Sequence, residues 1–137
     1  MKLPSLSELL AYQNEQVVQH FCHHHPTLSY KEGKLLFRDL LAWMWLKTHR
    51  KANNQNTYLF GPLLTLDAIW HSFILHTHDY LNFCQHYFGD YFHHKVEPIG
   101  FEHQLESEEL TDFLHDCFEY LGEDWVCRHF AAVLSEN

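Results

Sequence analysis

Four residues in the middle of the chain, one aspartate and three histidines, have types and spacings that could do chemistry. Asp67 and His71 are four positions apart, so on a helix they share one face. His93 and His94 follow Gly89 and should therefore lie on a separate piece of backbone. Imidazole and carboxylate groups that converge from separate segments are typical ligands of transition metals. We therefore predict a metal site at Asp67, His71, His93 and His94.

The roles within this group stay open. Asp67 either binds the ion directly or orients His71 through a hydrogen bond. Adjacent residues in extended backbone point to opposite sides, so only one of His93 and His94 should face His71, and we favour His94. The alternative is that His71 completes a buried hydrogen bond and the histidine pair lies on the surface.

Zn²⁺ is the first candidate for the ion, because imidazole and carboxylate suit it. Fe²⁺ is the second, since two histidines and one carboxylate form the ligand set of non-haem iron oxygenases. A protein without any metal is the third reading. The sequence contains no H-E-x-x-H, which excludes the metalloproteases built on that motif.

Four neighbouring residues could support the site: Trp70, Thr77, Tyr80 and Cys84. We expect Trp70 to pack in the core and the Tyr80 hydroxyl to bond toward the site, while Thr77 begins a new helix. Cys84 could be a nucleophile, but its position on an aromatic helix face favours an inert buried thiol.

A second histidine group precedes this region. His20, His23 and His24 fall on one face of an expected helix. That spacing could hold a metal, but a polar helix end is the favoured interpretation, since histidine suits the negative end of the helix dipole.

Apolar residues recur at helical spacing throughout, and no alternating strand pattern is present. We predict an all-α fold, a single domain over 1–137, built as one compact bundle of about five to six helices with an irregular loop at His93 and His94. Ser29 with Glu32 fits a capping box, and Gly89 should end a helix. The expected helices span about 5–24, 30–49, 65–76, 78–88, 107–121 and 124–134, with caps at Thr65 and Ser107. Leu81 should lie on the buried face of 78–88. The apolar face of the last helix should carry Trp125, Val126, Phe130 and Val133. The Asn-rich stretch 51–58 should be a loop, either disordered or a lid over a site.

Composition narrows the function classes. The formal net charge is −9, from 9 basic and 18 acidic residues, which argues against nucleic acid as a partner. We expect no membrane span, because no apolar run of about 18 residues exists. The four cysteines form no C-x-x-C pair. Together with the lack of a signal-like start, this favours reduced thiols and a cytoplasmic protein.

The central stretch L-D-A-I-W-H-S-F-I-L-H-T-H-D-Y-L-N-F-C, followed by F-G and then H-H, resembles the glycine-rich domain-containing protein-like family. The family pattern falls here on Asp67, Trp70, His71, Leu75, Thr77, Tyr80, Cys84, His93 and His94. The resemblance implies a shared fold and a site at these residues, and it implies no particular enzymatic activity. Two departures matter. This chain has five glycines in all and no glycine-rich tail, so roles of such tails do not transfer. Phe73 stands where the family often has another histidine.

Three functions compete. The preferred one is a metal-binding module with a regulatory or scaffolding role. The second is a metal-dependent enzyme, a hydrolase or oxygenase, that uses an open position on the ion. The third is a protein-interaction domain in which the motif is purely structural.

Overall fold

The computed structural model describes residues 1–100 and 102–134, and within them every regular element is helical. This confirms the all-α prediction, with more helices than expected. The elements are α1 (Leu6–Leu10), α2 (Glu15–His24), α3 (Tyr30–Ala52), η1 (Gly61–Leu63), α4 (Leu64–Leu75), α5 (Thr77–Phe88), α6 (Ser107–Asp116), η2 (Cys117–Leu121) and α7 (Glu123–Leu134). None of these helices combines the length and apolar character needed to cross a bilayer.

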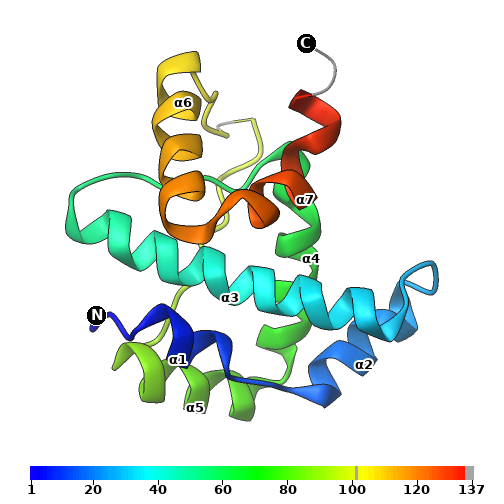
Figure 1. Ribbon diagram of the computed structural model, residues 1–137. Helices are drawn as coiled ribbons and strands as arrows, with labels where there is room; N and C mark the ends of the chain where they lie inside the picture. The colour runs from blue at the N-terminus through cyan, green and yellow to red at the C-terminus, as the bar shows by residue number, and fades with distance from the viewer. Residues whose placement is uncertain (101, 135–137) are drawn as a thin grey trace.

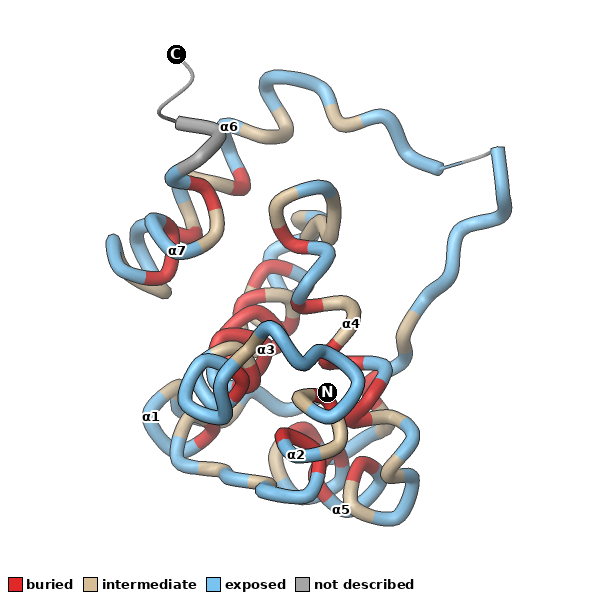
Figure 2. Tube along the Cα trace, turned by 90° about the vertical axis from the view of Figure 1, so that its right-hand side faces the viewer, coloured by how far each residue is buried: buried red, intermediate tan, exposed pale blue. Residues whose placement is uncertain are grey.

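Helix α3 crosses the middle of the molecule, with α1, α2 and α5 on one side of it and α6 and α7 on the other (Figure 1). The expected capping box starts it: the Ser29 hydroxyl accepts from the Glu32 N–H at 3.1 Å, and the Glu32 carboxylate accepts from the Ser29 N–H at 3.0 Å. Buried residues run along most of α3 (Figure 2), because neighbours cover it on several faces. Helix α3 is therefore the central helix, and the other helices pack around it.

The N-terminal helix is broken, so the prediction of one helix over 5–24 was wrong. Residues 11–14 separate α1 from α2. Asn14 has an extended backbone, and its side chain accepts from the Val17 N–H at 3.1 Å. An asparagine side chain bonded in this way competes with a continuous helix and starts a new one.

Helices α4 and α5 carry the central motif. Pro62 lies in the 3₁₀ turn that leads into α4, which begins at Leu64 without a side-chain cap, so Thr65 lies inside the helix and the predicted cap was wrong. The chain breaks at His76, as predicted, but no Thr77 side-chain cap forms at the start of α5. Gly89 ends α5 with a φ of 73°, a left-handed conformation that glycine adopts without strain.

Two charged contacts fasten the C-terminal helices to α3. The Asp39 carboxylate, almost fully buried, accepts from Arg128 at 2.7 Å and lies 2.8 Å from the His129 ring nitrogen. The buried Arg50 guanidinium donates to Asp112 at 3.0 Å and also to Asp116. Buried charges are stable only when paired in this way.

Three other expectations need correction or completion. Helix α6 is capped by a Glu106–Glu109 capping box, not by Ser107. Leu81, expected inside, is 43% exposed. In the last helix Trp125, Val126 and Phe130 are buried as expected, whereas the Val133 side chain lies outside the described part of the chain.

The Asn-rich stretch is attached to its neighbours. The Asn56 carbonyl accepts from the Arg50 Nε at 2.9 Å, and the Tyr58 carbonyl accepts from the Trp43 indole N–H at 3.0 Å. The Tyr58 hydroxyl donates to Glu109 at 2.8 Å. The stretch is a loop from residue 53 on, as predicted. These bonds join it to α3 and α6, so the expectation of disorder was wrong.

Candidate metal centre

Three of the four predicted ligand residues meet in one place. The Nε2 atoms of His71 and His94 lie 3.2 Å apart. The Asp67 carboxylate lies 2.5 Å from the His94 Nε2 through one oxygen and 3.5 Å from the His71 Nε2 through the other. One ligand atom from each residue lies within 4.8 Å of the other two. Residues 27 positions apart are thus brought to a common point.

Helix geometry explains two of the three. Asp67 is in the first turn of α4 and His71 is one turn later, so their side chains project from one face. The His71 side chain is 56% exposed, against 26% for Asp67. The group therefore lies at the surface, with one imidazole open to water.

A chain of buried hydrogen bonds positions the third residue, His94. The Tyr80 hydroxyl accepts from the Trp70 indole N–H at 3.0 Å and donates to the Phe92 carbonyl at 2.5 Å. Phe92 is itself only 1% exposed. Two residues later the His94 ring lies on Trp70, with centroids 4.2 Å apart. Trp70 and Tyr80 thus fix the backbone from which His94 reaches Asp67.

His93 lies outside the group. It is exposed, and its ring packs against Tyr91 at a centroid distance of 4.7 Å. The alternation of buried Phe92, exposed His93 and half-buried His94 is the pattern expected of extended backbone, in which successive side chains point to opposite sides.

The remaining motif residues have structural surroundings. Burial raises the pKa of the Cys84 thiol, although the Phe92 backbone and the Tyr80 side chain act in the opposite direction. Burial also raises the pKa of Tyr80, so its hydroxyl stays protonated and remains a donor. Thr77 is exposed at the start of α5 and takes no part in the group. The thiol chemistry considered for Cys84 has no support in this environment.

The three converging atoms can be satisfied without a metal or with one. Without a metal, the His94 Nε2–H donates to Asp67 and the His71 Nε2 stays unprotonated, because N–H groups on both rings would crowd each other across 3.2 Å. Alternatively, a cation replaces the His94 proton. Two nitrogens bound to Zn²⁺ at about 2.0–2.1 Å in tetrahedral geometry lie about 3.3 Å apart. The His71–His94 distance of 3.2 Å matches that edge, while the 2.5 Å contact of Asp67 with His94 would open by about 0.8 Å.

The sequence did not reveal what holds the third ligand. Phe92 contributes through its carbonyl oxygen, which no side-chain pattern marks. The sequence did offer one signal, the apolar Phe92 directly before His93 and His94. If Phe92 points inward in extended backbone, His94 also points inward.

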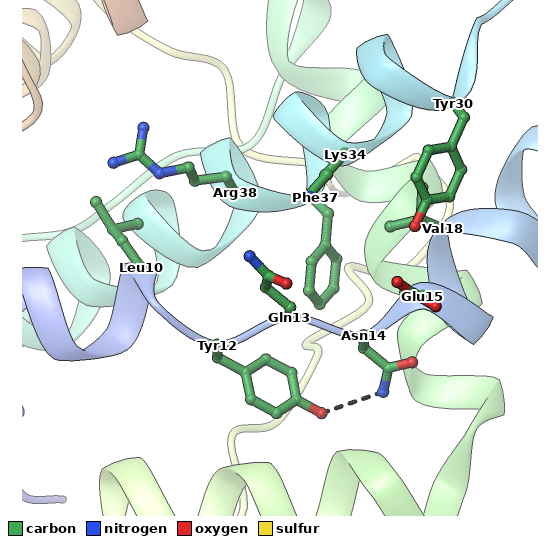
Figure 3. Close-up of a pocket in the computed structure, with 10 residues that line it drawn as sticks. All are labelled: Leu10, Tyr12, Gln13, Asn14, Glu15, Val18, Tyr30, Lys34, Phe37 and Arg38. Atoms are coloured by element: carbon green, nitrogen blue, oxygen red, sulfur yellow. Dashed lines mark hydrogen bonds between the residues drawn. The ribbon is translucent and has the colours of Figure 1, made fainter.

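A separate hollow of about 120 Å³ lies between the 11–14 segment and α3 (Figure 3). Phe37, Glu15, Lys34 and Arg38 are among the residues that line it, and the Asn14 amide donates to the Tyr12 hydroxyl there. None of the three converging residues lines this hollow, so it is distinct from the candidate metal centre.

Comparison with known proteins identifies the family. Searches among curated proteins and among solved structures found no match. The UCP032817-like family matches residues 8–117, which include Asp67, His71 and His94 and end just after α6. The chain therefore belongs to the UCP032817-like family.

Proposed function

We propose that this protein is a metal-binding module whose ion is held by Asp67, His71 and His94. One observation carries the proposal: two imidazole nitrogens 3.2 Å apart face the same carboxylate. Such an arrangement is costly for two N–H groups and favourable for two lone pairs around a cation. The anchoring of His94 through Trp70 and Tyr80 adds the rigidity that metal ligands need.

Zn²⁺ is the proposed ion and Fe²⁺ the second candidate. Both accept two imidazoles and a carboxylate. The net charge of −9 favours a cation over an anionic ligand such as nucleic acid.

An enzymatic role is the second candidate function. It is supported by the ligand count, because three protein ligands leave a position for water, as in catalytic zinc sites. When bound in that way, Zn²⁺ activates water for hydrolysis. His71, the most exposed of the three, would border the open position.

Two finer assignments are also proposals. The spacing of the central motif supports placing the chain with the glycine-rich domain-containing proteins. All four cysteines are free thiols, which supports a reducing compartment such as the cytoplasm.

The test is elemental analysis of untagged protein after exposure to Zn²⁺ or Fe²⁺ and gel filtration. His71→Ala should lose the ion bound at this centre and keep its helical circular dichroism, because the side chain is 56% exposed. His93→Ala is the matched control, since it removes an adjacent histidine outside the group. Full loss in His93→Ala, or full retention in His71→Ala, would contradict the ligand assignment.

The enzymatic alternative is separable. Metal-loaded protein should hydrolyse an activated ester or phosphate ester faster than His71→Ala does. Equal rates in both would leave the binding role standing and remove the hydrolase.

A further inference from the structure

A second group of histidines lies where α2 meets the junction of α4 and α5. The His20 ring contacts His24, one turn later on α2, at a centroid distance of 4.8 Å. It also contacts His76, the residue between α4 and α5, at 5.3 Å. His23 flanks His24 at 5.2 Å. Helices α2 and α4 pack together, so these contacts join segments more than 50 positions apart.

The hydrogen bonding of two of these rings bears on metal binding. The Nδ1 atom of His20 is buried and has no hydrogen-bond partner among the described residues. A buried polar atom without a partner is uncommon and often marks a bound water or ion. The Nδ1 of His76 lies 2.8 Å from the Ser72 carbonyl and must donate to it, which leaves the Nε2 lone pair free. A backbone carbonyl that fixes the tautomer in this way is the usual partner of a metal-binding histidine.

We propose that His20, His24 and His76 form a second transition-metal site, one built from imidazoles alone. Two histidines four apart on a helix can chelate one ion, and His76 supplies a third nitrogen from the opposite segment. The rings meet edge to face in this structure. Their nitrogens do not all lie within 4.8 Å of one another, so binding an ion requires the exposed His24 side chain to rotate its nitrogen inward.

The chemistry of this second site differs from that of Asp67, His71 and His94. It has no carboxylate, so the ion that it binds should be a late divalent metal, Cu²⁺ or Zn²⁺. The general order of metal affinities predicts tighter binding of Cu²⁺. An ion here would tie α2 to the end of α4. It should raise the melting temperature by roughly 5–10 °C at a hundredfold excess over Kd.

The experiment counts ions bound per chain in untagged protein equilibrated with Cu²⁺ or Zn²⁺ and passed through gel filtration. Wild type should hold two. His24→Ala and His71→Ala should hold one each, and the double variant none. His115→Ala, which removes an exposed helical histidine elsewhere, is the matched control and should hold two. The melting-temperature rise with Cu²⁺ should disappear in His24→Ala and persist in His71→Ala.

The outcomes separate this site from the proposed function. Undiminished binding and an undiminished melting-temperature rise in His24→Ala would overturn the second site, whatever happens in His71→Ala. One ion in wild type that is lost only in His24→Ala would support the second site and contradict the proposed function. Wild type that binds no ion would overturn both.

Discussion

Replacing Tyr80 by phenylalanine tests how the candidate metal centre is held. The change removes one hydroxyl that accepts from the Trp70 indole and donates to the Phe92 carbonyl. Both partners would be left buried and unpaired. An unpaired buried group costs about 1–3 kcal/mol, so the free energy of unfolding should fall by about 2–4 kcal/mol after partial relaxation. The free energy of unfolding of single domains is about 5–15 kcal/mol, so the variant should still fold.

The same change should weaken metal binding without touching a ligand. The Phe92 carbonyl fixes the backbone two residues before His94, and loss of such outer support typically lowers metal affinity about 10–100-fold. Calorimetric titration with Zn²⁺ measures the affinity, and urea denaturation followed by tryptophan fluorescence measures the stability.

Tyr87→Phe is the matched control, because Tyr87 is a half-buried tyrosine on the same helix. It should change stability by less than about 1 kcal/mol and leave the affinity for Zn²⁺ unchanged. If Tyr80→Phe binds Zn²⁺ as tightly as wild type, the hydrogen-bond chain does not position His94, and our account of the site is wrong.

Two further perturbations test the packing. Burial alone would raise the pKa of the Asp39 carboxyl, but the hydrogen bonds from Arg128 and His129 outweigh it and hold that pKa below its ordinary value. Its stabilising effect is therefore complete above the unfolded-state value of about 3.9 and is lost as pH falls through the lowered pKa. The urea midpoint should drop more steeply below about pH 4 in wild type than in Asp39→Asn, and parallel slopes would argue against this. Gly33→Ala should lower the free energy of unfolding by about 1 kcal/mol, although helix propensity favours alanine, because the new Cβ would lie 2.5 Å from the Cys22 Sγ. The clash would be contradicted if Gly33→Ala alone raised the free energy of unfolding, or if adding Cys22→Ala did not restore it.

The parts of the fold that the sequence predicted are those with local signals. The Ser29–Glu32 capping box and the glycine at Gly89 each set a helix boundary through their own backbone and near neighbours. The break at residues 11–14 had such a signal in Asn14, but the continuous apolar spacing around it favoured one long helix. Thr65 does not cap α4, because the 3₁₀ turn that contains Pro62 leads directly into the helix, which already begins at Leu64.

The candidate site divides in the same way. The placement of Asp67 and His71 on one face follows from helix spacing, so the sequence was sufficient for that pair. The approach of His94 depends on a bond between the Tyr80 hydroxyl and a backbone carbonyl. A contact to the main chain leaves no pattern of side-chain types in the sequence. For this reason only the structure could show how close His94 lies to Asp67 and His71.

The exposure of His71 has a kinetic consequence. With one imidazole 56% accessible, an ion at this centre presents a side to the solvent, where a chelator can bind it before any helix separates. Its departure rate would then follow chelator concentration and be independent of the global unfolding rate. That behaviour suits a protein that loads and unloads with the surrounding metal supply, and it contrasts with an enclosed structural zinc that leaves only when the fold opens.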